Sequence, residues 1–247
     1  MTPSPPFADS GTAARAFPPP DYARSSIGER DVVALRSVAD AVASALAGAP
    51  TLADWAAARA AQELAGGRGP AWRVDLGGAS AVIRHYRRGG WMGPLLGDRY
   101  LDNPPRPFVE LSVSEALREA GVRTPRVLAA VVTAARPGYR ADIVTERLSP
   151  GLDLEELLRP NLYPPAERAA ALEEAGRTIG RAHAAGLAHP DLRPRNLFLQ
   201  PLADGGWQAA LLDLDRARIA PRNEPPTKKK TSRASTDRSP RSAARAA

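Results

Sequence analysis

The sequence of 247 residues predicts an α+β fold in which a small antiparallel-sheet lobe precedes a helical lobe. Apolar and polar residues alternate on both sides of Gly77-Gly78, which is the pattern of a β-hairpin. Two further strand patterns end before residue 147, and the longest helical pattern, residues 165–185, comes only after them. Because strands come first and helices later, the two kinds of element are expected to segregate into separate lobes.

The chain before the hairpin is expected to be an extension of this fold. Residues 1–28 are rich in Pro, Ala and Ser and are predicted to be disordered. From Asp31 to Leu46 apolar residues recur near every 3.6 positions, which predicts a helix, and residues 54–64 continue as Ala-rich helix or irregular structure. We therefore expect one domain over residues 29–220, with a first lobe at about 64–146 and a second at about 149–220.

The remaining elements follow from local patterns. The glycines of residues 66–70 predict a tight turn. The elements expected after it are strands 72–76 and 81–86, a helix at 107–120, strands 127–132 and 139–144, a short helix at 152–158 and a long helix at 165–185. Gly121 and Gly186 each follow a helix, where glycine is a common terminator. The buried stripe of the long helix is expected to comprise Leu172, Ala175, Ile179 and Ala182.

Composition excludes several classes of site. The chain has no Cys, which rules out a disulfide framework, a Cys-based zinc site and a thiol nucleophile, and three His leave little material for a histidine metal cluster. The start of the chain lacks the basic and apolar regions of a secretory signal. No run approaches the roughly 18 apolar residues of a membrane helix. We expect a soluble cytoplasmic protein.

The net charge of +7 is concentrated at the end of the chain. Residues 221–247 contain eight basic and two acidic side chains, and therefore +6 of the total. All three lysines lie there, at 228–230. A solvated, disordered basic tail is the preferred interpretation over an arm that binds nucleic acid or membrane, so no nucleic-acid partner is expected.

The sequence H-P-D-L-R-P-R-N at residues 189–196 has the spacing of a kinase catalytic loop. A second acid, Asp213, follows Asn196 by 17 residues at the end of an apolar run. In phosphoryl transfer, Asp191 would accept the proton of the attacking hydroxyl, while Asn196 and Asp213 would hold Mg²⁺ through hard oxygen atoms. Single Asp or Asn residues are usually turn formers, so the prediction rests on the joint pattern.

Three neighbours of this loop allow two interpretations each. Arg193 is either a donor to the γ-phosphate or an exposed loop arginine. Asp215 either faces metal or substrate, or pairs with Arg216 or Arg218. His189 is expected to be a structural residue bonded to the backbone rather than a catalytic base.

The nucleotide site is predicted from the first lobe. Arg84 stands on the return strand of the hairpin, where kinases carry a lysine that binds phosphate, and its ion-pair partner is expected to be Glu110 rather than Glu115. Phosphate cover is assigned to the turn containing Gly67, Arg68 and Gly69, and the adenine contact to backbone groups around Glu146. Together these residues predict ATP as the phosphate donor.

Several longer blocks carry a resemblance to a known family. They are R-H-Y-R-R-G-G at 84–90, D-R-Y-L at 98–101, Y-R-A-D at 139–142, the loop at 189–196, and L-D-L-D-R-A-R at 212–218. Over residues 64–219 the chain resembles the 3-deoxy-D-manno-octulosonic acid (Kdo) kinases of the lipopolysaccharide kinase group, which have a protein-kinase-like fold.

The resemblance implies ATP-dependent phosphorylation of a Kdo hydroxyl on a lipid A precursor. It places the protein in the cytoplasm, peripheral to the inner face of the inner membrane. On that basis the turn with Arg87, Arg88, Trp91 and Met92 is either a contact with the anionic glycolipid or a solvated hairpin end.

The chain also departs from that family. Pro190 stands where a small residue is usual, and Ala217 where Gly is usual. After Arg218 a Lys/Ser/Arg/Ala-rich tail replaces the expected helices, so we expect a shortened helical lobe, from a truncated or frameshifted C-terminus or a native tail. The alternatives are a kinase of the same fold acting on a heptose or an aminoglycoside, and a catalytically impaired pseudokinase.

Overall fold

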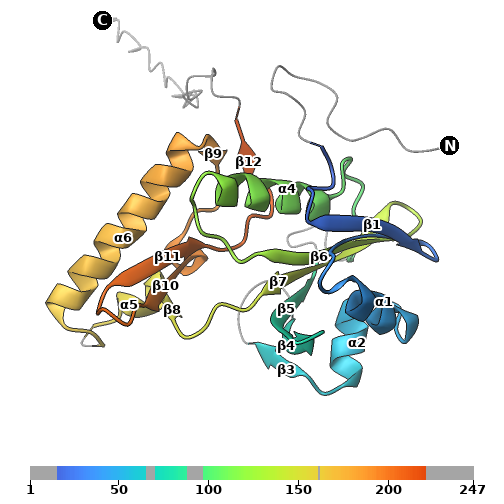
Figure 1. Ribbon diagram of the computed structural model, residues 1–247, viewed down its shortest axis with the longest axis horizontal. Helices are drawn as coiled ribbons and strands as arrows, with labels where there is room; N and C mark the ends of the chain where they lie inside the picture. Colours follow the sequence, from blue (N-terminus) through green and yellow to red (C-terminus); the bar gives the residue numbers. More distant parts are fainter. Residues whose placement is uncertain (1–15, 65–69, 88–96, 161, 221–247) are drawn as a thin grey trace, which may run out of the picture.

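The computed structural model describes residues 16–64, 70–87, 97–160 and 162–220 (Figure 1). Within these ranges the chain forms two lobes, each with its own hydrophobic core. The first is built on a seven-stranded sheet and the second on the long helix α6 with two small sheets. The predicted α+β class with two lobes is confirmed. The segments predicted as phosphate cover, at 66–69, and as glycolipid contact, from 88 to 92, lie outside the described residues.

The first lobe is an antiparallel sheet with the strand order β1-β2-β6-β7-β5-β4-β3. The hairpin β4–β5 turns at Gly77 and Gly78, whose φ angles of 62° and 83° are positive and therefore favour glycine. The strands are β1 Tyr22–Ile27, β2 Arg30–Leu35, β3 Gln62–Leu64, β4 Ala71–Leu76, β5 Ala79–His85, β6 Val127–Ala134 and β7 Tyr139–Glu146. The predicted hairpin and the predicted strand pair at 127–144 are both present.

The N-terminal part of the chain corrects two predictions. Residues 22–27, expected to be disordered, form β1, and residues 30–35, mostly expected to be helical, form β2. The side chains from Val32 to Leu35 are consecutive, apolar and buried, and β2 pairs with β1 on one side and β6 on the other. A short apolar run fits a buried strand as well as a helix. Here the pairing of β2 with β1 and β6 makes it a strand. The first lobe therefore begins near residue 22 rather than 64.

Helix α4, Arg106–Glu119, connects the two lobes. Phe108 and Leu111 belong to the first core, whereas Val113 and Leu117 belong to the second. In Figure 1 this helix runs across the top of both lobes. It is followed by Gly121 with φ 75°, as predicted. Two other helices, α1 Ala39–Ala47 and α2 Leu52–Ala58, pack in the first lobe.

The second lobe contains more strand than predicted. Its helices are α5 Leu154–Leu157, α6 Pro165–Ala184 and the 3-10 turn η1 Pro194–Asn196. Its strands are β8 Leu152–Asp153, β9 Leu187–Ala188, β10 Leu197–Pro201, β11 Trp207–Leu211 and β12 Arg218–Ile219, in sheets of order β11-β10-β8 and β12-β9.

The buried stripe of α6 differs from the predicted one. Leu172 is 43% exposed, and the buried positions are Ala171, Ala175, Thr178 and Ala182. Small side chains allow the helix to lie close to β10 and β11. The buried stripe therefore includes Ala171, and the larger neighbour Leu172 is left at the surface.

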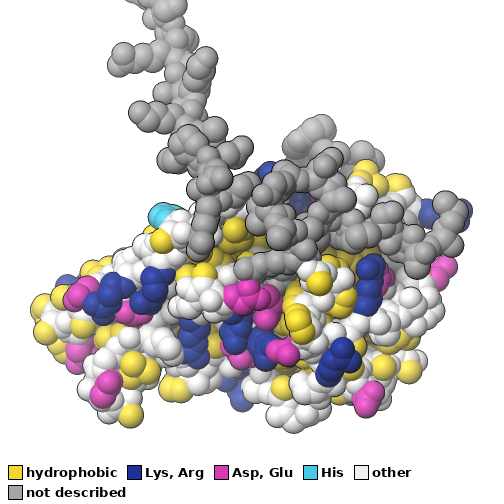
Figure 2. Space-filling model, turned by 45° about the horizontal axis from the view of Figure 1, so that its top comes forward, with side chains coloured by type: hydrophobic (Ala, Val, Ile, Leu, Met, Phe, Trp, Pro, Cys, Tyr) yellow, Lys and Arg dark blue, Asp and Glu magenta, His cyan; other side chains and the backbone are white. Residues whose placement is uncertain are grey.

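The surface of the described part of the chain carries both signs of charge. On the face shown in Figure 2, acidic and basic side chains are interspersed over both lobes. Among the described helices, none has both the length and the apolar character that a membrane crossing requires.

Candidate active site

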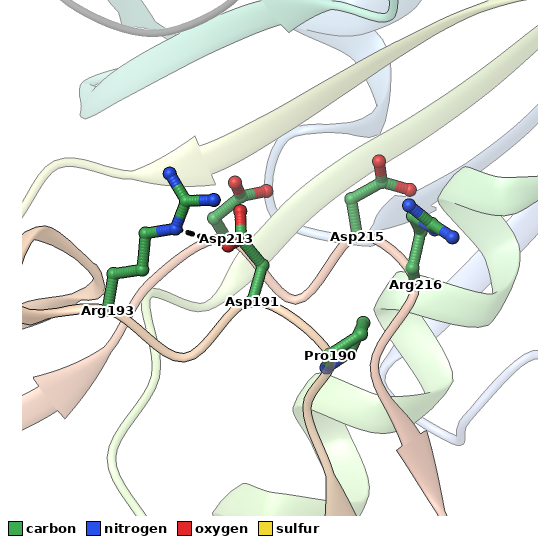
Figure 3. A pocket seen from close by; sticks show the side chains of 6 residues that line it. All are labelled: Pro190, Asp191, Arg193, Asp213, Asp215 and Arg216. Carbon is green, nitrogen blue, oxygen red and sulfur yellow. Dashed lines mark ion pairs between the residues drawn. The ribbon is translucent and has the colours of Figure 1, made fainter. Parts of the chain in front are cut away.

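The predicted catalytic residues meet in a cavity of about 190 Å³ in the second lobe (Figure 3). Strands β10 and β11 pair antiparallel, with Leu197 opposite Leu211. The start of β10 and the end of β11 therefore lie side by side, and so do the loop before β10 and the segment after β11. The cavity is lined by Pro190, Asp191, Arg193, Asp213, Asp215 and Arg216.

Asp191 is held by its neighbours in the loop. Nε of Arg193 lies 2.5 Å from Oδ1 of Asp191, and their side chains are 60% and 31% exposed. The backbone N–H of Asp191 donates to Nδ1 of His189 at 3.2 Å, in agreement with the structural role predicted for that histidine. The loop thus presents the Asp191 carboxylate to the cavity beside a cation.

Asn196 supports the same loop through two hydrogen bonds. Its Nδ2 donates to the carbonyl of Asp191 at 2.8 Å, and its own carbonyl accepts from the backbone N–H of Leu212 at 2.8 Å. The buried side chain of Asn196 therefore holds the loop at Asp191, while its backbone is bonded to the residue before Asp213. With Nδ2 engaged, Oδ1 is the atom of this amide that can donate an electron pair to a cation.

The oxygen atoms at this end of the sheet suit magnesium better than a metal that needs many carboxylates. Within the described ranges, no group of three or more His, Asp or Glu side chains is arranged to hold a metal ion. Mg²⁺ prefers one or two carboxylates completed by amide or phosphate oxygens and water. Asp213 and Asn196 fit that donor set. Asp213 follows the end of β11 at Leu211 and adopts a φ of 51°, in the left-handed region.

Arg84 reaches the site from β5 of the first lobe. Its Nη2 donates to Oε1 and Oε2 of Glu110, at 2.7 and 2.9 Å, and its Nη1 lies 3.3 Å from Oδ1 of Asp213. The predicted partner, Glu110, is thus the one that the fold supplies. Glu115 instead accepts from the hydroxyl of Tyr22 at 3.1 Å.

Burial governs the electrostatics of this ion pair. Burial raises the pKa of Glu110, although the charge of Arg84 and a hydrogen bond from the hydroxyl of Tyr86 act against the rise. Burial also disfavours the charged form of Arg84, but Glu110, Tyr86, Asp213 and Asp215 together outweigh this effect and raise the pKa of the guanidinium. Arg84 therefore remains a cation at the junction of the two lobes.

A second arginine, Arg106 at the start of α4, contacts a residue that lines the cavity, and sequence reasoning did not predict it. Nη1 of Arg106 lies 3.4 Å from Oδ2 of Asp215, and its Nε donates to Asp102 at 2.9 Å. Its guanidinium also lies 4.7 Å from the ring centre of Tyr100. Asp215 faces the cavity, but its ion-pair partner is Arg106 rather than Arg216 or Arg218 as considered from the sequence. Arg106 and Glu110 are one helical turn apart, so α4 meets both Asp215 and, through Arg84, Asp213.

A buried histidine cluster supports the first lobe behind Arg84. His85 contacts Oδ1 of Asp142 through Nδ1 at 2.7 Å, and Oδ2 of Asp98 through Nε2 at 3.0 Å. Arg140 donates to Asp98, and the second oxygen of Asp142 accepts from the backbone of Leu52 at the start of α2. Burial disfavours the charged imidazole, but the two carboxylates outweigh it and raise the pKa of His85. The only sequence indication of this cluster is that its side chains fall within the blocks at 84–90, 98–101 and 139–142.

The remaining predicted nucleotide contacts are placed only in part. Gly67, Arg68 and Gly69 lie outside the described residues. Glu146 ends β7, and its backbone N–H donates to the carbonyl of Arg126 at 2.8 Å. The next N–H, that of Arg147, donates to Ser80 at 2.9 Å. These two N–H groups already donate to backbone carbonyls, so an adenine contact here would use other backbone groups.

Comparison with known proteins places the chain in a family. The family model "Lipopolysaccharide kinase (Kdo/WaaP) family" matches residues 52–232. A 3-deoxy-D-manno-octulosonic acid kinase of Stenotrophomonas maltophilia is 39% identical over 157 residues, covering 62% of this chain and 59% of that protein. One from Vibrio vulnificus is 32% identical over 176 residues, covering 64% of this chain and 73% of that protein.

Among solved structures, WaaP in complex with acyl carrier protein is 26% identical, with a TM-score of 0.46 over 66% of this chain and 65% of that one. The chain spans about three fifths of the length of the Stenotrophomonas relative. The family match covers most of the chain and includes every residue of the cavity. The chain belongs to the lipopolysaccharide kinase (Kdo/WaaP) family.

Proposed function

We propose that the chain is an ATP-dependent sugar kinase that phosphorylates a hydroxyl of Kdo on a lipid A precursor. The strongest support is that Asp191 and Asp213 line the same cavity, and that Arg84 of the other lobe contacts Asp213. Phosphoryl transfer needs a proton acceptor, an oxygen donor for Mg²⁺ and a cation for the phosphates. The relatives named Kdo kinases support the choice of sugar.

The roles of the side chains follow from their positions. Asp191 accepts the proton of the sugar hydroxyl as its oxygen bonds to the γ-phosphorus and the bond to the ADP oxygen breaks. Arg193 lies against Asp191 and can turn its fork of donors to the transferred phosphoryl group. Asp213 and Asn196 would hold Mg²⁺, which neutralises phosphate charge when bound with ATP. Arg84 would then exchange its 3.3 Å contact with Asp213 for the phosphates while Glu110 keeps it in place.

The nucleotide is proposed to lie between the lobes, with Gly67, Arg68 and Gly69 over its phosphates and the end of β7 near Glu146 beside its base. The acceptor is a Kdo-bearing lipid A precursor at the cytoplasmic face of the inner membrane. Arg87 and the residues that follow it are assigned to the anionic glycolipid. No nucleic-acid partner is proposed, because 1–220 carry a net charge of only +1.

Transfer of labelled phosphate from ATP to defined acceptors tests this function. The full chain is incubated with Mg²⁺, γ-labelled ATP and one of three acceptors: a Kdo-bearing lipid A precursor, the same precursor without Kdo, or a heptose-bearing acceptor. We expect label only in the first. Label in the heptose-bearing acceptor alone would reject Kdo as the substrate, and absence of label from all three would support the catalytically impaired alternative.

A further inference from the structure

One of the charged side chains that line the cavity has no ion-pair partner among the described residues. Asp191 pairs with Arg193, Asp213 with Arg84 and Asp215 with Arg106. The last lining cation, Arg216, makes no hydrogen bond or ion pair with any described residue in the structure. The guanidinium of Arg216 therefore keeps its donors available to a ligand, whereas Arg193 is held by Asp191.

Arg216 lies on the opposite side of the cavity from Arg193. In Figure 3, Arg193 is at the left, the carboxylates of Asp191 and Asp213 are in the middle, and Arg216 is at the right beside Asp215 and above Pro190. Arg193 contacts Asp191 at one end of the cavity, and Arg216 lies at the other end. A molecule in the cavity would have Asp191 next to it and Arg216 at its far end.

The backbone presents Arg216 from a fixed turn. The neighbouring side chains of Leu214 and Ala217 are buried in the second core, and the N–H of Ala217 donates to the carbonyl of Leu214 at 2.9 Å. Within this turn Arg216 has a φ of 69°, in the left-handed region. Glycine adopts that conformation without strain, whereas arginine does not. An arginine in a strained position that points its side chain into a cavity is explained by the use of that side chain.

We propose that Arg216 binds the carboxylate of an acidic sugar acceptor and thereby selects it and orients its hydroxyl toward Asp191. This inference rests on the proposed function, since it concerns the acceptor of the same reaction. Kdo is an acid, whereas a heptose carries no carboxylate. A guanidinium binds a carboxylate through two parallel hydrogen bonds, which fixes orientation as well as affinity. Arg216 is a specificity residue, separate from the proton acceptor and the phosphate-binding cations.

Steady-state kinetics of the full chain tests the assignment. Arg216→Gln is expected to raise KM for the Kdo-bearing acceptor about 10- to 100-fold, the range for a lost charged hydrogen-bonded pair. KM for ATP should change less than twofold. The matched control is Arg218→Gln, because Arg218 is exposed on β12 and does not line the cavity. It should leave both constants within twofold.

An acceptor whose Kdo carboxylate is converted to a carboxamide identifies the group that Arg216 recognises. The wild-type chain should show a similarly raised KM for the carboxamide, and Arg216→Gln should raise it no further, because both changes remove the same contact. Equal effects of the variant on the acid and the carboxamide would overturn the proposal. So would an unchanged KM for the acid.

A binding measurement separates this inference from the proposed function. Free Kdo and its carboxamide are titrated by saturation-transfer NMR into the wild-type chain and Arg216→Gly, which relieves the left-handed backbone and keeps the fold. Binding of Kdo by the wild type, lost in the variant and with the carboxamide, supports the inference even if no phosphate is transferred. Equal binding by both proteins, or no binding by the wild type, overturns it, whereas absence of transfer alone rejects only the proposed function.

Discussion

Nη2 of Arg84 donates to both carboxylate oxygens of Glu110, at 2.7 and 2.9 Å. Nη1 of the same guanidinium lies 3.3 Å from Asp213. One side chain of β5 therefore joins α4, which packs in both cores, to the segment that follows β11 in the second lobe. Removal of either acid changes how the two lobes are held together.

Substitution of the buried acid is expected to destabilise the fold. Glu110→Gln leaves the Arg84 cation without its main counter-charge, and because the Arg84 side chain is 33% exposed, solvent reduces the cost to about 1–2 kcal/mol. Urea unfolding measures the change. The control Glu173→Gln alters an exposed residue of α6 and should have little effect. Equal midpoints for the two variants would contradict the role given to the pair.

Arg84→Lys examines whether arginine is the working cation of this site. A lysine carries one compact ammonium group and cannot contact Glu110 and Asp213 through separate nitrogen atoms. We expect KM for ATP to rise several-fold in Arg84→Lys and more in Arg84→Met, with kcat measured in parallel. Higher activity in the lysine variant would mean instead that arginine impairs the enzyme.

The His85 cluster predicts a dependence of stability on pH. The folded pKa of His85 lies above its unfolded value of about 6.5, so its contribution is complete below that pH and is lost as pH rises through the raised pKa. The charged groups that face His85 are Asp142 and Asp98, and Asp98 in turn pairs with Arg140. The wild-type Tm should fall between pH 6 and the folded pKa, and His85→Gln should remove this slope.

At pH 6, His85→Gln should also cost about 3 kcal/mol, because it leaves Asp142 buried without its cation. The matched variant is His183→Gln, which changes an exposed histidine of α6. If the two variants retain the same pH slope as the wild type, His85 is not the titrating group.

A double-mutant cycle tests the contact between Arg106 and Asp215. Arg106→Gln, Asp215→Asn and the double variant should show a coupling of about 0.5–1 kcal/mol in unfolding free energy, since both side chains are largely shielded from solvent. A parallel cycle on Arg177 and Glu173 of α6, an exposed pair four residues apart, should give a smaller coupling. Additive effects at 106 and 215 would show that the contact does not hold α4 to the cavity.

Local patterns predict the parts of the fold that depend on near neighbours. The hairpin at Gly77-Gly78 and α4 with its terminal Gly121 follow from turn chemistry and apolar spacing. The patterns fail at Arg30–Leu35, because a short apolar run is compatible with a helix and a strand alike and only β1 and β6 decide.

In the candidate site, too, local patterns predict the residues that are close in sequence and miss those that are far apart. The spacing of Asp191, Asn196 and Asp213 predicts their meeting, because β10 and β11 follow one another and pair. Arg106 is 109 residues from Asp215, and His85 is 57 residues from Asp142. Contacts over such distances arise from the sheet order and the placement of α4, which no short pattern encodes.

In the proposed reaction, the Asp191 carboxylate accepts the proton of the sugar hydroxyl during phosphoryl transfer. The decisive measurement is kcat for phosphate transfer to the Kdo-bearing precursor by wild type and Asp191→Asn, with the Kd for Mg-ATP determined in parallel. We predict that kcat falls about 100- to 10 000-fold while the Kd stays within threefold. Transfer of phosphate by Asp191→Asn at the wild-type rate would show that Asp191 is not the proton acceptor.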